Sequence, residues 1–248
     1  MRYAVSPDFG ECMIKIARRG KMQESIKKFM RALRQIRCRK IGLRLECRAD
    51  LIEANTEIAT IEENLSTLLL QLSQARKVIG SIAIVNSGPN LEIASLLTVL
   101  ERRYTTCICI QGSYVSSAAF LEIFNSANYP RLVKLELVDN QLDLSNVRGL
   151  QAADFNYLNW LKIEMNPIGD RGAKVLCKAN MPKLRNLTLM QINASAKIFS
   201  YLQKMSVCKE QTVLSLSISN LTSQTENLIS SLSFYHVELI EEDETYDK

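Results

Sequence analysis

Three copies of one short pattern lie at a constant spacing in the second half of this chain. Each copy has leucine or isoleucine at its first, fourth and sixth positions, and the copies begin at Leu132, Leu158 and Leu184. They are 26 residues apart, and the first two carry an asparagine at the ninth position. A fixed period of this size predicts a repeat architecture, in which each unit contributes a short strand and buries its apolar side chains against its neighbours.

The pattern continues more weakly in both directions. The pairs that we align with its fourth and sixth positions are Ile82 and Ile84, Cys107 and Cys109, and Leu216 and Ile218. The six units then follow at intervals of 25, 28, 26, 26 and 29 residues, which exceeds the three or so units that a stable solenoid needs. In this alignment the side chains of Cys107 and Cys109 point into the core, and Ile108 and Ile110 point outward.

Between these segments the apolar residues follow the spacing of a helix. The helical stripes are Ile93, Leu96, Leu97 and Leu100, then Ala173, Leu176 and Cys177, and then Ile198, Leu202 and Met205. Asp170 is a favourable N-cap for the second stripe. Each repeat is therefore predicted to run strand, turn, helix, which gives an α/β solenoid with parallel strands on the concave face and helices on the convex face.

Residues 166–176, with the sequence NPIGDRGAKVL, resemble the turn and helix start of the ribonuclease-inhibitor-like class of leucine-rich repeats. This class is similar to the repeat arrays of NOD-like receptors and of the GTPase-activating protein for Ran, and the resemblance covers residues from about 79 to 233. It implies a surface for binding proteins. By analogy alone it also suggests regulation of a small GTPase. The class prefers asparagine or cysteine where this chain has Ser87, Gly112, Ile192 and Leu221, so we expect irregular curvature.

The segments outside the repeats differ from them in composition. Residues 1–48 are predicted to form a basic amphipathic helical cap, and residues 49–78 a long helix, either in an oversized first repeat or in a dimerising coiled coil. Residues 79–233 hold the leucine-rich repeats. Residues 234–248 form an acidic tail, which is most simply disordered.

The two ends of the chain carry opposite charge. Residues 1–48 have a net charge of +10 and the last eleven residues a net charge of −5, within a total of +5. The predicted phosphate-binding or acidic-partner residues are Lys27, Lys28, Arg31, Arg34 and Arg37. They suggest an alternative function as a ribonucleoprotein or nucleic-acid-associated factor. Contact with an anionic membrane, or a structural cap with a solvated basic face, also fits this segment.

Residue patterns typical of catalysis are missing from the sequence. There is no phosphate-binding glycine loop, no HExxH and no EF-hand, and the only histidine is His236. We therefore expect no enzyme activity, no cofactor, no metal and no small-molecule substrate. Seven cysteines without a CxxC pair, acidic residues near the start of the chain and the lack of a membrane-length apolar stretch predict an intracellular protein, cytoplasmic or nuclear, with an organelle not excluded.

The outward positions of the predicted strands include Trp160, the only tryptophan of the chain. A large aromatic residue among lysine, glutamate and methionine has the composition of an interface hot spot. The predicted partner-binding residues are Lys134, Glu136, Trp160, Lys162, Glu164, Met165, Arg185 and Met190. In the alternative interpretation, neighbouring side chains or an N-terminal segment cover Trp160. The leading hypothesis is a non-enzymatic protein–protein interaction module, an adaptor or a subunit of a larger assembly.

Overall fold

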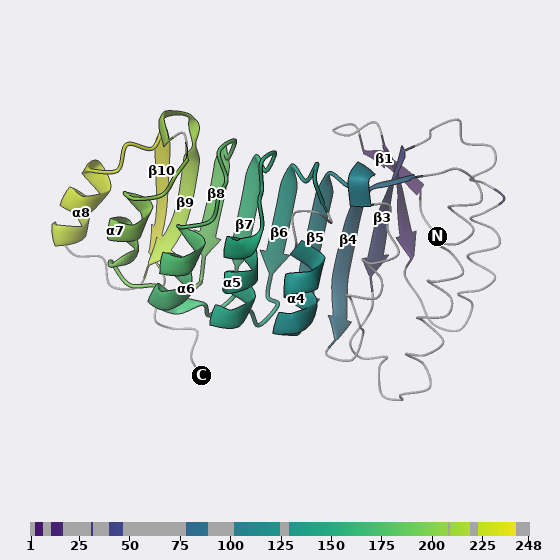
Figure 1. The fold of residues 1–248 in the computed structure, drawn as a ribbon, viewed down its shortest axis with the longest axis horizontal. Helices are drawn as coiled ribbons and strands as arrows, with labels where there is room; N and C mark the ends of the chain where they lie inside the picture. The colour runs from purple at the N-terminus through teal and green to yellow at the C-terminus, as the bar shows by residue number, and fades with distance from the viewer. Residues whose placement is uncertain are drawn as a thin grey trace.

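The computed structural model describes residues 3–6, 11–16, 31, 40–46, 78–88, 102–124, 129–207, 209–218 and 223–241. Within these residues ten strands form one sheet, and their order in space is their order in the sequence (Figure 1). The strands are β1 (Tyr3–Ser6), β2 (Glu11–Ile16), β3 (Lys40–Glu46), β4 (Val78–Gly88), β5 (Cys107–Ser113), β6 (Lys134–Val138), β7 (Trp160–Glu164), β8 (Asn186–Met190), β9 (Val213–Ile218) and β10 (His236–Glu241).

All neighbouring strands pair in parallel except β1 and β2, which are antiparallel. The register places Leu135 opposite Leu161, and Leu161 opposite Leu187. Equivalent positions of the repeated pattern therefore lie side by side, one strand for each repeat. This serial, solenoid-like α/β arrangement agrees with the order of strands and helices that the sequence predicted.

Helices cover one face of the sheet from β5 onward (Figure 1). They are α4 (Ser117–Phe124), α5 (Leu144–Ala152), α6 (Gly169–Leu176), α7 (Ile198–Leu202) and α8 (Ser223–Ser230), with short 3-10 helices η2 (Arg102–Tyr104) and η3 (Lys209–Gln211). The core lies between these layers. Leu135 and Leu161 on the strands and Phe120 and Phe199 on the helices are each 0% exposed. Burial of such side chains is the main favourable term in the stability of the fold.

The helix starts differ from one repeat to the next. At α5, the Asp143 carboxylate accepts hydrogen bonds from the backbone N–H groups of Ser145 and Asn146, and the Asn146 side chain accepts one from the Asp143 N–H. At α6, Ile168 occupies the N-cap position and makes no side-chain cap. The prediction of Asp170 as the N-cap is therefore wrong, because its carboxylate instead accepts two hydrogen bonds from Ser195 in the next repeat.

The register of β5 and β9 also differs from the predicted alignment. Ile108 and Ile110 are 0% exposed and point into the core, whereas Cys107 and Cys109 are half-buried on the opposite face. In β9, Leu214 lies opposite Leu187, a position that we had given to Leu216. The core residues that face one another are Ile82, Ile108, Leu135, Leu161, Leu187 and Leu214, at intervals of 26, 27, 26, 26 and 27 residues. The repeat is thus more regular than the sequence alignment indicated.

Buried asparagines close the turns after β6 and β7. The Asn166 side chain accepts hydrogen bonds from the N–H groups of Asn140 and Leu142 at 2.9 and 3.2 Å, and donates to the carbonyl oxygens of Leu137 and Glu164 at 3.0 and 2.8 Å. Asn140 makes equivalent contacts to the preceding repeat. At Ile192 the side chain is apolar and buried, so this ladder stops as expected there.

Both ends of the described sheet depart from the predicted domains. β1, β2 and β3 lie within residues 1–48, where we had expected a helical cap. β10 lies in the predicted disordered tail, where it pairs in parallel with β9. Arg31 is helical and exposed. The rest of the basic helix and the helical stripe of 93–100 fall outside the described residues. So does the long helix predicted for 49–78, apart from Val78, which begins β4.

Candidate protein-binding face of the sheet

The face of β5–β9 that points away from the helices is called the open face below. Strand register arranges its side chains in rows that run across the sheet. The first row is Cys107, Lys134, Trp160, Asn186 and Val213; the second is Cys109, Glu136, Lys162, Thr188 and Ser215; the third is Gln111, Val138, Glu164 and Met190. The structure therefore brings six of the eight predicted partner-binding residues into one block on β6, β7 and β8.

The other two predicted residues lie at the margins of this block. Met165 follows β7, has a positive φ of 54° and is 48% exposed. Arg185 precedes β8, is exposed, and its guanidinium donates a hydrogen bond to the Gln211 side chain. The two side chains are therefore at opposite ends of the strands, and a partner would have to span the strand length to contact both.

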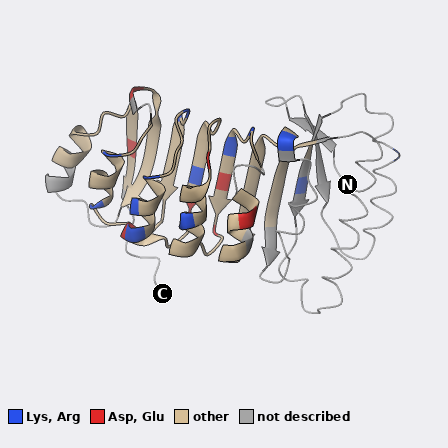
Figure 2. Ribbon diagram, viewed as in Figure 1, with Lys and Arg blue, Asp and Glu red and all other residues tan. Residues whose placement is uncertain are grey.

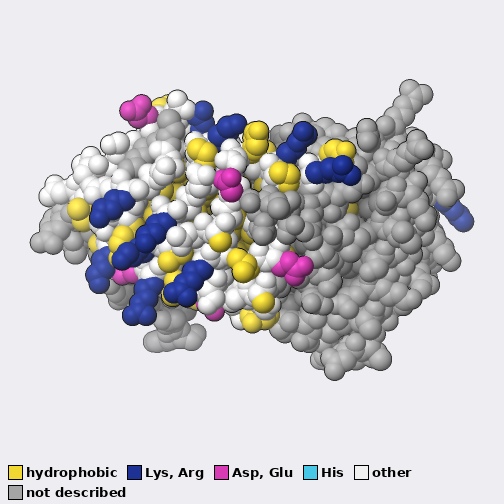
Figure 3. Space-filling view, in the orientation of Figure 1, with side chains coloured by type: hydrophobic (Ala, Val, Ile, Leu, Met, Phe, Trp, Pro, Cys, Tyr) yellow, Lys and Arg dark blue, Asp and Glu magenta, His cyan; other side chains and the backbone are white. Residues whose placement is uncertain are grey.

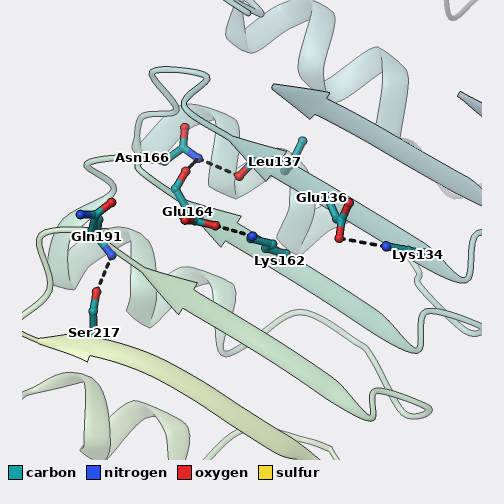
Figure 4. A network of polar contacts seen from close by, with 8 residues as sticks. All are labelled: Lys134, Glu136, Leu137, Lys162, Glu164, Asn166, Gln191 and Ser217. Atoms are coloured by element: carbon teal, nitrogen blue, oxygen red, sulfur yellow. Dashed lines mark hydrogen bonds and ion pairs between the residues drawn. The ribbon is translucent and has the colours of Figure 1, made fainter. Parts of the chain in front are cut away.

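Two ion pairs lie along neighbouring strands of the open face (Figure 4). Lys134 Nζ is 3.0 Å from Glu136 Oε1, and Lys162 Nζ is 2.5 Å from Glu164 Oε2. Residues two apart on a strand point to the same face, which explains why each pair forms within its own strand. The four side chains are 20–31% exposed, and pairs that remain in contact with water contribute no more than about 1 kcal/mol to stability. Their main effect is to orient both charges on the face.

Charge on the open face is confined to its centre. β6 and β7 supply all the charged side chains of this face, while β5, β8 and β9 supply uncharged ones, as the ribbon in Figure 2 shows. On the N-terminal side, β4 is buried on both faces, because Ser81, Ala83 and Val85 are 5–8% exposed on the side opposite Ile82 and Ile84. The accessible part of the face therefore begins at β5.

Trp160 lies in the middle of the first row and is half-buried. The ammonium of Lys134 is 5.0 Å from the centroid of its ring, a cation–π distance. The indole Nε1 has no contact with solvent and no hydrogen-bond acceptor within the described residues. An N–H group buried without an acceptor costs about 1–3 kcal/mol. The side chain is thus less exposed than its position in the strand predicts, and its hydrogen-bonding capacity is unused.

Two cysteines belong to the open face although the sequence analysis assigned them to the core. Burial raises the pKa of the Cys109 thiol to about 11, and the neighbouring charge of Glu136 and a hydrogen bond to it act in the same direction. Cys109 therefore stays a thiol at neutral pH, and a thiol is a poor nucleophile and a poor metal ligand. A signal for this arrangement was present in the sequence. Aligning Ile108, in place of Cys107, with Ile82 and Leu135 gives more even intervals between repeats.

The second predicted site cannot be assembled from the structure. Lys27, Lys28, Arg34 and Arg37 lie outside the described residues, and Arg31 is the one member whose side chain is described. Across the described ranges, no three histidine, cysteine, aspartate or glutamate side chains are grouped closely enough to hold a metal ion. No helix in the same ranges has the length and hydrophobicity to span a bilayer.

No protein-family model matches the sequence, and no curated protein is significantly similar to it.

Proposed function

We propose that this chain is a leucine-rich-repeat protein of the ribonuclease-inhibitor-like class. Three features support this assignment: core residues that recur at 26 or 27 residues, one parallel strand for each repeat, and buried asparagines that join successive turns. The turn and helix between Asn166 and Leu176 carry the sequence that most resembles the class. Helices on one side of the sheet leave the strands of the other side as the natural contact surface.

The proposed function is protein binding without catalysis, as an adaptor or as a subunit of a larger assembly, through the open face around Trp160. One observation carries this proposal. The indole N–H of Trp160 is buried without an acceptor in the described part of the chain, on a face that also holds two ordered ion pairs. Because solvent does not reach the N–H in this conformation, a partner would satisfy it with a carbonyl or carboxylate oxygen after the indole turns outward, and the partner would then also cover the ring.

The predicted contact combines this aromatic anchor with charges of both signs. Trp160 provides the large buried area that interface hot spots use. Lys162 and Glu164 follow Trp160 on the same face of β7 and would determine which partner charges are accepted. Thr188 and Met190 of β8 add uncharged surface on the C-terminal side.

Two variants test the open face in affinity purifications of the tagged full chain. Trp160→Ala removes the anchor, and the double variant Lys162→Glu, Glu164→Lys keeps an ion pair within β7 but reverses its direction. We expect each variant to lower recovery of the specific partner by about 10-fold or more, because losing a hot spot costs about 2 kcal/mol or more of binding free energy. Far-UV circular dichroism verifies that the variants are folded.

Tyr157→Ala is the matched control, since Tyr157 is 52% exposed and lies before β7 rather than on the open face. Its recovery of partner should equal that of the unmodified chain. If both open-face variants also recover the partner normally while folded, the open face is not the binding surface.

A further inference from the structure

The helix side of the molecule carries a cluster of cations that the proposed function does not use. Between residues 143 and 207 the chain has nine lysines or arginines and four aspartates or glutamates. Six of these cations lie on or next to α5, α6 and α7, and all six are exposed. This cluster, called the basic helix face below, consists of Arg148, Arg171, Lys174, Lys178, Lys197 and Lys204. Figure 3 shows the lysine and arginine side chains gathered over this part of the molecule.

The repeat period orders these cations in two directions. On α6, Arg171 and Lys174 are three residues apart and so lie on one side of the helix, and Lys178 follows in the turn after the helix ends. Between helices, Lys197 and Lys204 occur 26 residues after Arg171 and Lys178, at equivalent positions of the next repeat. Neighbouring helices pack about 8–10 Å apart. The cations therefore form a grid across neighbouring repeats.

Carboxylates in this region are already engaged by other groups. Asp143 caps α5, and the carboxylate of Asp170 accepts hydrogen bonds from Ser195. Asp154 accepts from the side-chain amides of Asn156 and Asn180. None of the six cations forms an ion pair with a carboxylate of the described residues, where the ion pairs found are those of the open face. Within the described residues, the six cations are therefore not held in ion pairs.

The chemistry of the surface favours a phosphate backbone over other anionic partners. The large apolar side chains that are exposed among the described residues include none from α5, α6 or α7. Protein partners need such anchors, and membrane-surface helices insert them into the lipid. The aromatic ring inside the grid, Tyr201, is half-buried beneath Lys174 at 5.9 Å, so it offers no platform for stacking single-stranded bases.

We infer that the basic helix face binds the backbone of double-stranded nucleic acid without sequence preference. Contacts between lysine or arginine and phosphate supply the affinity of such binding. They do not require the protein to recognise base edges in the grooves. This site is on the opposite side of the sheet from the open face and is independent of the function proposed there. Its residues are also different from those of the basic segment near the N-terminus.

The test measures binding of 24-base-pair RNA and DNA duplexes of one mixed sequence to the full chain by fluorescence anisotropy at several salt concentrations. The variant Arg171→Glu, Lys174→Glu, Lys178→Glu changes three exposed side chains of the grid. We expect its affinity for at least one duplex to fall by roughly 100-fold at 0.1 M salt, and the slope of log affinity against log salt to become less steep by about 3. A second duplex sequence should give the same values.

The matched control Arg103→Glu, Arg131→Glu, Lys183→Glu makes the same change in net charge at exposed residues before the strands. It should retain most of the affinity and the slope. An equal loss in the control would show that net charge alone is responsible and would overturn the assignment. So would an unchanged affinity and slope in the grid variant. The assignment is also overturned if the grid variant loses binding to phosphatidylserine vesicles or to polyglutamate but still binds the duplexes.

Discussion

Asn166 is an amide side chain in an otherwise apolar core, and it holds two repeats together. It is 0% exposed and makes four hydrogen bonds, all to backbone groups. Two of its partners, the N–H groups of Asn140 and Leu142, belong to the turn of the preceding repeat. Buried backbone groups must be paired in this way, because water cannot reach them. The side chain therefore fixes both the turn and the spacing between repeats.

Replacing Asn166 by alanine should lower the free energy of unfolding by about 2–4 kcal/mol, because each buried backbone group left without a partner costs about 1–3 kcal/mol. A urea titration followed by circular dichroism measures the change. Asn156→Ala is the control, since Asn156 is exposed and donates one hydrogen bond, to Asp154. Its effect should stay within about 0.5 kcal/mol. Equal effects of the two substitutions would contradict the structural role of Asn166.

Trp160 shows how far the position of a residue in a strand determines its environment. Alternation along β7 places its side chain on the open face, as predicted. Lys134 on β6 then lies over the ring and contributes to its half-burial. Whether a partner binds Trp160 is tested by the variants proposed above.

At the scale of single elements, the space around Gly172 of α6 is tighter than the space around Gly149 of α5. A Cβ atom added at Gly172 would lie 2.6 Å from Cβ of Ile168, which precedes the helix and is buried. At Gly149 of α5 the nearest atoms would be 3.4 Å away, on Phe120 and Leu121. Both glycines are in helices, so the difference comes from packing and not from backbone conformation.

We expect Gly172→Ala to destabilise the protein by about 1–2 kcal/mol. Alanine favours a helix by up to about 1 kcal/mol relative to glycine, but overpacking against Ile168 costs about 1–3 kcal/mol. Gly149→Ala should be neutral or stabilising, because its Cβ makes an ordinary contact and the helix gains propensity. Thermal unfolding of the two variants measures the difference. A stabilising Gly172→Ala would show that the turn at Ile168 moves away at little cost.

β5 illustrates why strand register was difficult to predict. In the run from Cys107 to Ile110, cysteine and isoleucine alternate, so both faces of the strand are apolar and the alternation does not distinguish inside from outside. The adjacent strands decide the register, since Leu135 and Leu137 of β6 are buried opposite Ile108 and Ile110. The larger aliphatic side chains then fill the core and the smaller thiols face outward.

At the scale of the whole molecule, the described sheet is well packed in the middle and looser at β10. Leu161 and Ile163 of β7 are 0% exposed, while Val237 and Leu239 of β10 are only partly buried and Ile240 is 46% exposed. β10 pairs with β9 and with no other strand of the described sheet. In a structure built from nearest-neighbour contacts, such an end opens more readily than the centre.

Hydrogen exchange followed by mass spectrometry should detect this gradient. Peptides that cover β10 are expected to exchange about 10-fold or more faster than peptides that cover β7, after correction for intrinsic rates, because a difference of about 1.4 kcal/mol in opening free energy gives a factor of ten. β6 and β8 serve as internal references, since each has a paired strand on both sides. Protection of β10 equal to that of β7 would mean that the sheet opens as one unit.

The sequence by itself determined the period, the alternation of strands and helices, and the core positions of the three central repeats, because these depend on spacing within a few residues and on repetition every 26 residues. It also placed Trp160 and the charged residues of β6 and β7 on one face. The tertiary structure alone decided the register of β5 and β9, the cap at α6, the recruitment of β10 and the half-burial of Trp160. These features depend on which side chains meet across neighbouring repeats, and such contacts are set by the packing of the whole array.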